Sequence, residues 1–179
     1  MNRVLSRNLK RIATVRNGES GFTLIELVVV LVIIGIAVLI AIPSFKGMTR
    51  SSNVTSATND LVSSLNLARS EAVTRSVNVT VCKSANLTSC ITTNSWEQGL
   101  VVFTDIDGDG TIDAGDAIIR VYNGPTDGTT MIGNANVANR LTYANTGFFN
   151  AVFNGTITVT SGTRTLSIIT SASGRVRTE

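Results

Sequence analysis

The feature that most constrains this chain is an apolar run near its N-terminus. From Leu27 to Ile42, sixteen consecutive residues have no polar side chain. Counted from Phe22 the stretch has 21 residues, and as a helix it would be roughly 30 Å long, the thickness of the hydrocarbon core of a bilayer. We therefore expect a helix that crosses a membrane once, with Glu26 as the one ionisable residue inside it.

The basic residues are concentrated in front of this run. Five of the 15 basic residues and one of the 12 acidic residues precede Phe22. This leaves ten basic and eleven acidic residues, so the rest of the chain has a net charge of −1, against +3 for the whole. A positive segment before a membrane span predicts a cytoplasmic N-terminus, with the C-terminal part on the other side. No small-residue cleavage site follows the run, as it would in an ordinary secretory signal.

Glu26 needs an explanation, because an ionised carboxylate in hydrocarbon costs several kcal/mol. Its side chain could reach the interface, or it could cap its own helix at the N-terminus, where negative charge is favoured. Alternatively, the chain is cut after Gly21, which gives Phe22 a free α-amino group. In a helical assembly, the ammonium group of one subunit would then pair with the Glu26 carboxylate of its neighbour.

The motif "GFTLIEL", followed by the apolar run and Pro43, resembles the leader of type IV prepilins and type II secretion pseudopilins. In that family a membrane-bound prepilin peptidase cuts after the glycine and methylates the new N-terminus. The resemblance implies a removed leader at 1–21, cleavage between Gly21 and Phe22, and N-methylation of Phe22. It also implies an assembly role for Glu26 and a bend at Pro43, because proline breaks a helical hydrogen bond.

The same resemblance implies a location and partners. The protein would sit in the inner membrane with its head in the periplasm, and would then enter a pilus or pseudopilus. Its partners would be other pilins or pseudopilins, which it would contact through the N-terminal helix.

After the proline, apolar residues recur three and four positions apart, which is typical of an amphipathic helix lying on a core. They are Val54, Ala57, Leu61, Leu65, Ala68 and Ala72. We expect one continuous helix whose membrane and assembly half is 22–43 and whose amphipathic half is 44–76. The alternative is two helices with a break near 44–47.

Residues 77–179 predict a β-rich head. Short segments rich in β-branched and aromatic residues are separated by Gly, Asn, Asp and Ser, which is typical of strands and turns. The predicted strands are 77–83, 99–104, 117–123, 147–153, 155–160 and 164–170, with hairpin turns at 160–163 and 171–174. The fold class is therefore α+β, a long N-terminal helix packed on an antiparallel sheet. The passages "LNLARSEAVTRSVNVTVC" and "WEQGLVVFTDIDGDGTIDAGDAIIRVY" resemble minor pilins of the GspH and FimT type, and this similarity covers nearly the whole chain.

The chain has no histidine, which excludes Ser-His-Asp and Cys-His catalysis and most zinc sites. A membrane-anchored hydrolase would have only clustered aspartates for acid–base chemistry, so we expect no enzyme and no cofactor apart from a candidate calcium site. The two cysteines, Cys82 and Cys90, are expected to form a disulfide in an oxidising compartment, and two buried free thiols are the alternative.

The candidate calcium site is the segment "DIDGDGTIDAGD", 105–116, which has five aspartates in twelve residues. With Gly110 at the sixth position, the spacing matches an EF-hand-like loop. The flanking segments are predicted strands, however, and Asp116 is shorter than the usual glutamate. We therefore favour a solvated hairpin with Asx-turns over a calcium site. The candidate ligands are Asp105, Asp107, Asp109, Asp113 and Asp116.

A second charged group lies at the C-terminus, where "GRVR" occupies 174–177. Arg175 and Arg177 are two residues apart on an expected strand, so they should share a face. Neighbouring guanidinium groups suit phosphate oxygens and predict salt-sensitive binding that is largely independent of sequence. The motif is similar to the Gly-Arg-x-Arg motif of FimT-type pilins, which is implicated in DNA binding during natural transformation. The resemblance implies that both arginines contact DNA and that Gly174 shapes the turn.

The final hairpin is expected to bring Arg164 close to these arginines, and we add Arg140 as a further candidate by proximity. Solvated arginines on a β-surface are the alternative. The leading hypothesis is a minor type IV pilin that captures DNA for uptake. The alternative function is a minor pseudopilin of a type II secretion system, whose head contacts other pseudopilins or secreted cargo.

Overall fold

The computed structural model describes residues 21–93, 95–125 and 128–179. Its longest element is helix α1, Leu24–Arg75, which has 52 residues. The chain divides into two compact units, of which the second begins at Pro43.

The first unit contains the apolar half of α1. Residues 24–42 are all exposed, and α1 is long and apolar enough to cross a membrane. Thr23 caps the helix, because its hydroxyl accepts a hydrogen bond from the backbone N–H of Glu26 at 3.3 Å. Among the described residues, none forms a hydrogen bond or an ion pair with the Glu26 carboxylate.

The helix is continuous through Pro43, so the alternative of two helices broken near 44–47 is wrong. The bend at Pro43 stays a prediction. α1 ends at Arg75 because the next residue, Ser76, takes a left-handed φ of 57°.

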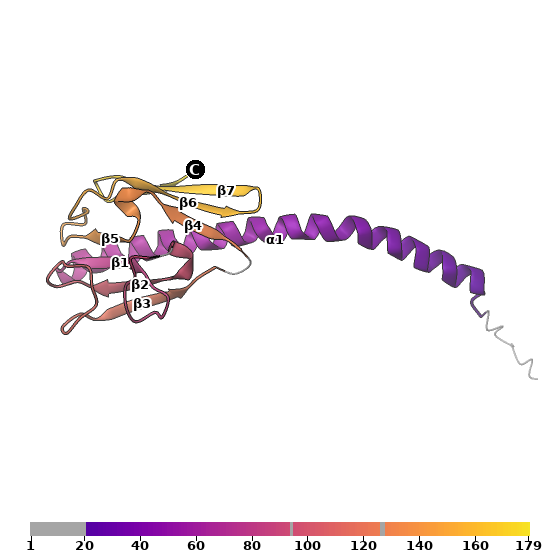
Figure 1. Ribbon diagram of the computed structural model, residues 1–179, viewed down its shortest axis with the longest axis horizontal. Coiled ribbons are helices and arrows are strands. Elements are labelled where there is room, and N and C mark those ends of the chain that lie inside the picture. Colours follow the sequence, from indigo (N-terminus) through magenta and orange to yellow (C-terminus); the bar gives the residue numbers. More distant parts are fainter. Residues whose placement is uncertain (1–20, 94, 126–127) are drawn as a thin grey trace, which may run out of the picture. The chain divides into compact units, whose positions relative to one another are not determined.

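The second unit contains eight strands in two antiparallel four-stranded sheets (Figure 1). The first sheet has the order β3-β2-β1-β5 and the second has the order β4-β6-β7-β8. The strands of the first sheet are β1 (Val79–Lys83), β2 (Gly99–Thr104), β3 (Ile118–Asn123) and β5 (Arg140–Tyr143). Those of the second are β4 (Thr130–Gly133), β6 (Gly155–Ser161), β7 (Arg164–Thr170) and β8 (Val176–Thr178). Two short 3₁₀ helices, η1 (Trp96–Gln98) and η2 (Ala135–Val137), lie between strands.

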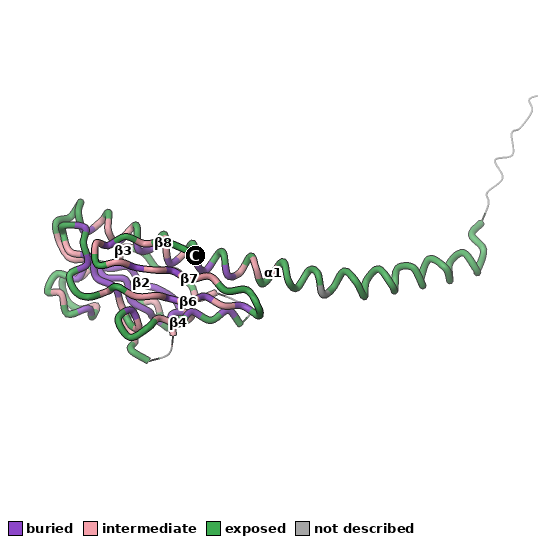
Figure 2. The backbone as a smooth tube through the Cα atoms, turned by 90° about the horizontal axis from the view of Figure 1, so that it is seen from above, coloured by how far each residue is buried: buried purple, intermediate pink, exposed green. Residues whose placement is uncertain are grey.

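Within this unit α1 and both sheets contribute to one hydrophobic core. The six helix residues with the predicted spacing are all buried, and they pack with inward-facing residues of both sheets. Figure 2 shows buried residues along the strands of this unit, whereas the apolar half of α1 is exposed. Trp96 is fully buried in this core, and its indole N–H donates a hydrogen bond to the Val137 carbonyl at 2.9 Å. The amphipathic pattern of the second half of α1 thus determines which face of the helix carries the head.

The predicted strand at 147–153 is wrong. Only one isolated bridge, between Phe149 and Tyr143, forms there. Gly147 takes a left-handed φ of 77° in a turn, which interrupts an extended run. The aromatic side chains pack on one another instead, with ring centroids 4.4 Å apart for Phe149 and Tyr143 and 5.6 Å apart for Phe149 and Phe153. The apolar residues of 147–153 are therefore explained by this aromatic cluster and not by a strand.

Two strands were not predicted from the sequence, namely β4 and β5. Each has only four residues and exists because it pairs with a longer neighbour. The strand expected around Arg175 and Arg177 is confirmed as β8, which pairs with β7. The sequence also indicated one sheet, whereas the head has two.

Candidate functional site

Arg175 directly precedes the edge strand β8, and Arg177 lies in it. These two residues are here called the arginine pair. Ile168 on the neighbouring strand faces the core, so the adjacent Ile169 faces outward. Arg177 is paired with Ile169 and therefore shares that outer face. Both arginines are exposed, and they line one surface groove. The arginine pair thus presents two guanidinium groups to solvent from the same face.

The turn that leads into β8 requires glycine at position 174. Gly174 is buried with a φ of 75°, and its N–H donates a hydrogen bond to the Ser171 carbonyl at 2.8 Å. A Cβ atom there would lie 2.7 Å from the Gly147 carbonyl oxygen and 2.9 Å from Cε1 of Tyr143. Gly174 therefore shapes the turn through both its backbone conformation and its close packing.

Two residues from other elements hold this turn, and neither was singled out from the sequence. The buried Tyr143 hydroxyl, on β5, donates a hydrogen bond to the Gly174 carbonyl at 3.1 Å. The Arg69 guanidinium, on α1, donates to the same oxygen at 3.4 Å. Because the arginine pair follows directly, its position is tied to the core through Gly174. No local pattern marks Arg69 or Tyr143 for this role, since Arg69 is 105 residues and Tyr143 is 31 residues away from Gly174.

Arg177 also forms an ion pair with Glu179, at 3.3 Å. Both side chains are largely exposed, 68% and 60%, so the pair is worth at most about 1 kcal/mol. An incoming anion can therefore replace Glu179 at little cost.

The predicted proximity of Arg164 to the arginine pair is wrong. Arg164 pairs with Ser161 at the far end of β7, five residues before Ile169, which is roughly 17 Å along a strand. It also projects to the opposite face, because it is two residues from Leu166, which packs on the core. The hairpin that the sequence predicted does exist, but only the end of β7 near the turn faces β8.

The predicted proximity of Arg140 is wrong as well. Arg140 is on β5 of the first sheet, opposite Cys82, and its guanidinium donates a hydrogen bond to the backbone carbonyl of Asp109. It also lines a cavity of about 320 Å³ between the disulfide loop and the acidic loop. Arg140 therefore belongs with the acidic loop and not with the arginine pair.

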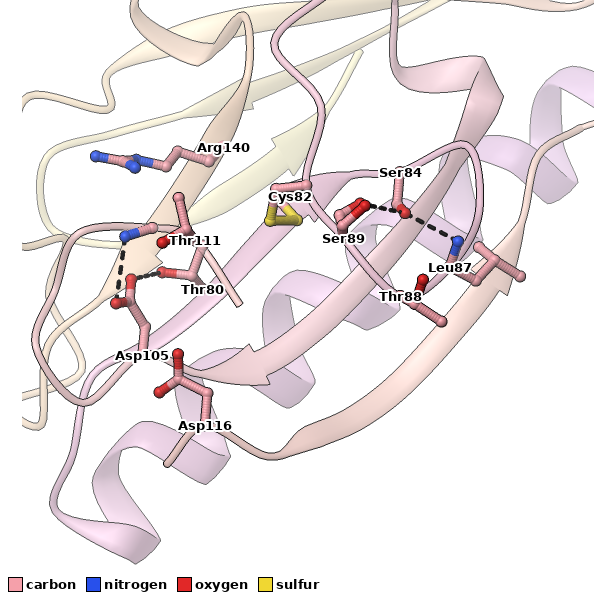
Figure 3. The surroundings of a disulfide bond; sticks show 12 residues. Thr80, Cys82, Ser84, Leu87, Thr88, Ser89, Asp105, Thr111, Asp116 and Arg140 are labelled. Atoms are coloured by element: carbon pink, nitrogen blue, oxygen red, sulfur yellow. Dashed lines mark hydrogen bonds between the residues drawn. A yellow bond between two sulfur atoms is a disulfide. The ribbon is translucent and has the colours of Figure 1, made fainter. Parts of the chain in front are cut away.

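The acidic loop, 105–116, connects β2 and β3 and is closed by its own hydrogen bonds (Figure 3). The Asp105 carboxylate is fully buried and accepts hydrogen bonds from the Thr80 hydroxyl at 2.5 Å and from the Gly110 N–H at 3.3 Å. The Asp116 carboxylate accepts a hydrogen bond from the N–H of Ile106 at 3.0 Å. Two Asx-turns lie between them, because Asp107 accepts a hydrogen bond from the Asp109 N–H at 3.3 Å and Asp109 accepts one from the Thr111 N–H at 2.6 Å.

Carboxylates are nevertheless close to one another in this loop. Oxygens of Asp105, Asp107 and Asp109 all lie within 4.8 Å of each other. Desolvation and the nearby carboxylates of Asp107, Asp116 and Asp109 raise the pKa of Asp113. Hydrogen bonds from the Thr111 side chain and backbone lower the pKa of Asp109. Such a group of oxygens is chemically suited to Ca²⁺, although calcium binding stays a prediction.

The disulfide joins Cys82 on β1 to Cys90, with their Cα atoms 5.7 Å apart, so the alternative of free thiols is wrong. It lies with Leu87 in a small cluster over the outer face of the first sheet (Figure 3). Ser84 closes the same loop, because its hydroxyl donates to the Ser89 carbonyl at 2.6 Å. The disulfide therefore holds a loop against the outer face of the first sheet.

The predicted processing site is at the start of the described chain. Gly21 and Phe22 are exposed, and the Phe22 side chain is 83% accessible. The predicted leader lies outside the described residues except for Gly21. Cleavage, methylation of Phe22 and the pairing of Glu26 stay predictions.

The buried Tyr143 hydroxyl, which donates a hydrogen bond to the Gly174 carbonyl, predicts that the stability of the folded protein depends on pH. Burial raises the pKa of Tyr143 to about 12, partly offset by Arg69, whereas the unfolded chain has the usual value of 10.0. The unfolded state therefore loses its proton first, and stability should fall between pH 10 and about pH 12, by up to roughly 2–3 kcal/mol. Chemical denaturation at pH 9 and pH 11.5 should show this fall, and Tyr143→Phe should be less sensitive to pH. An equal fall in both proteins would contradict the assignment.

For the acidic loop we expect no binding heat when the calcium-free protein is titrated calorimetrically with Ca²⁺. The reason is that the loop's carboxylates already accept hydrogen bonds from its own backbone. Asp107→Asn serves as the matched variant. Heat in the natural protein that disappears in Asp107→Asn would show that the loop is a calcium site.

Comparison with known proteins identifies the family. The family model described as type II transport protein GspH matches residues 57–174, more than half of the chain. The model described as prokaryotic N-terminal methylation motif matches residues 16–42, which include the predicted cleavage site. No curated protein matches the chain.

Two crystal structures of the type IV minor pilin FimU of Pseudomonas aeruginosa, in space groups P21 and P65, are similar in fold. The first is 21% identical, covers 74% of this chain and 92% of its own, and has a TM-score of 0.58. The second is 22% identical, covers 70% and 91%, and has a TM-score of 0.54. The predicted α+β pilin fold is confirmed. The chain is a member of the GspH family, which comprises minor pilins and pseudopilins.

Proposed function

We propose that this protein is a minor type IV pilin, a structural and non-enzymatic subunit whose arginine pair binds double-stranded DNA for uptake in natural transformation. One observation supports this most directly. Both guanidinium groups are exposed and line the same groove, on the open edge strand of the second sheet.

The chemistry of the groove suits a phosphate backbone. Guanidinium groups form charge-assisted hydrogen bonds with phosphate oxygens, and two residues apart on a strand they are spaced by roughly 6.6 Å. Glu179, the nearest competing acid, is held only in an exposed pair. Phosphate contacts carry no sequence information, so the binding would be independent of sequence.

The arginine pair can be tested by gel shift with the purified head, residues 50–179, and a double-stranded DNA fragment. Two phosphate contacts predict that the logarithm of the binding constant falls with the logarithm of salt concentration with a slope of about −1.8. Arg175→Ala with Arg177→Ala should remove most of the binding at low salt.

Arg164→Ala is the matched control, since Arg164 is on the same sheet but faces the other way. It should leave the affinity nearly unchanged. If the head shows no binding at low salt, or if the control weakens binding as much as the double variant, the DNA proposal fails.

A pseudopilin of a type II secretion system is the second candidate. The description of the matching family model, type II transport protein GspH, favours it. In that case the head would contact other pseudopilins or secreted cargo, and the arginine pair would have no DNA to bind. Co-purification with pilus subunits or with secretion subunits from the native envelope separates the two.

For both candidates we propose the same processing and topology. A prepilin peptidase would cut after Gly21 and methylate Phe22, and the apolar half of α1 would anchor the protein in the inner membrane. The basic residues before Phe22 favour a cytoplasmic N-terminus, which places the head in the periplasm. The disulfide is consistent with an oxidising compartment of this kind.

Assembly provides a test of the role of Glu26. In Glu26→Ala the membrane fraction should contain as much protein as before, because removing a charge favours insertion. Incorporation into sheared pili should drop strongly, because the α-amino group of the neighbouring subunit loses its partner. Glu71→Ala, a half-buried carboxylate of the amphipathic half that pairs with Arg75, is the control and should assemble. Normal assembly of Glu26→Ala would refute the pairing.

A further inference from the structure

The face of α1 that packs on the core changes from apolar to cationic at the base of the head. Val54 and Ala57 are buried in the core. One and two turns earlier, the same face presents Asn53, Arg50 and Lys46, at helical spacings of three and four. These polar residues share a surface hollow on the helix. The hollow is lined by Phe45, Lys46, Thr49, Arg50 and Asn53.

The turn between β6 and β7 lies against this face. Gly162, with a φ of 61°, packs so closely on Arg50 that a Cβ atom would be 2.9 Å from its Cδ and 3.0 Å from a guanidinium nitrogen. Arg164, two residues further on, is paired with Ser161. It projects to the helix-facing side of the sheet, the side on which Leu166 packs. The turn thus brings a third cation to the two on the helix.

These cations have no acidic partner in the described part of the chain. The ion pairs there involve Arg75 and Arg177, and neither Lys46, Arg50 nor Arg164 takes part in one. The Asn53 amide nitrogen is buried and has no hydrogen-bond acceptor. Lys46, Arg50 and the unsatisfied Asn53 amide therefore share one hollow, and Arg164 follows the turn that packs on Arg50.

We propose that this group, the basic collar (Lys46, Arg50, Arg164 and the Asn53 amide), binds the phosphate of anionic phospholipid headgroups. Its place in the chain supports a lipid as the source of phosphate. Lys46 follows the end of the apolar run, Ile42, by four residues, so the two cannot be further apart than about 14 Å whatever the angle between the two units. The headgroup layer lies directly outside the hydrocarbon core, which keeps lipid phosphates within reach.

The inference rests on membrane anchoring of the apolar half of α1, and it is independent of DNA binding by the arginine pair. The basic collar is on the helix-facing side of the second sheet, whereas the arginine pair is on its outer side. Binding of lipid would hold the base of the head at the membrane surface while the subunit is in the bilayer.

The test uses the full chain in detergent with equal amounts of phosphatidylglycerol and phosphatidylcholine, and measures the bound lipids by native mass spectrometry. The natural protein should retain phosphatidylglycerol preferentially. Each basic residue near an anionic surface contributes on the order of a fivefold preference, so Lys46→Gln with Arg50→Gln and Arg164→Gln should lower the preference at least about tenfold.

Two matched variants accompany it. Lys46→Gln with Arg50→Gln changes only exposed helix residues and should lower the preference by an intermediate factor. Arg175→Gln with Arg177→Gln removes charge from the other face and should leave it unchanged. All variants carry the same basic N-terminal segment, so its contribution to lipid binding cancels.

Three outcomes would overturn the proposal. The first is equal phosphatidylglycerol preference in the collar variant and the natural protein. The second is displacement of the lipid by inorganic phosphate at the same concentration, which would identify a site for free phosphate. The third is unchanged lipid binding together with lost co-purification of other pilus subunits, which would make the collar a contact with an acidic protein surface.

Discussion

The packing of one helix stripe against two sheets is the interaction on which the rest of this structure depends. The buried residues from Val54 to Ala72 pack into a core shared by both sheets. Each sheet alone would leave an apolar face in water, and burying such faces is the dominant favourable contribution to folding. The same helix is exposed and apolar all round from Leu27 to Ile42. Helix α1 is thus apolar all round in its first half and amphipathic in its second, where one face packs on the core.

The candidate DNA-binding edge depends on this core although it lies on the surface. The β8 strand has only three residues and little cross-strand pairing of its own. What places it is the turn at Gly174, whose carbonyl accepts hydrogen bonds from Tyr143 on the first sheet and Arg69 on the helix. A short edge strand can therefore present two guanidinium groups in a defined way, because its preceding turn is tied to buried groups from two other elements.

The fold also separates the four arginines that the sequence analysis grouped into one candidate DNA-binding patch. Arg140 is bound to the acidic loop through the Asp109 carbonyl, and Arg164 lies two residues after Gly162, which packs on Arg50. Only the arginine pair is left on the outer face of the second sheet. The four arginines of the predicted patch thus lie in three different places, namely the acidic loop, the helix-facing side of the second sheet and its outer face. The division follows from strand register, which decides both the position along a strand and the face.

Much of this architecture could be predicted from local patterns. The long apolar run, the helical spacing from Val54 onward and the β-branched and aromatic composition of the longer strands are local patterns, so they are visible in the sequence. The strand predicted at 147–153 was wrong, because aromatic residues that pack in a cluster give the same apolar, aromatic-rich sequence as a strand. The four-residue strands β4 and β5 carry too little pattern to be seen, and their existence depends on the longer strands with which they pair.

By itself, the sequence determined which segments are buried, where the helix turns amphipathic, and that the C-terminal arginines share a strand face, since all three follow from spacing along the chain. Only the tertiary structure decided that the strands form two sheets, that Tyr143 and Arg69 hold the Gly174 turn, and that Arg164 belongs to the base of the head. Those facts depend on contacts between residues far apart in the chain, and spacing along a sequence carries no information about them.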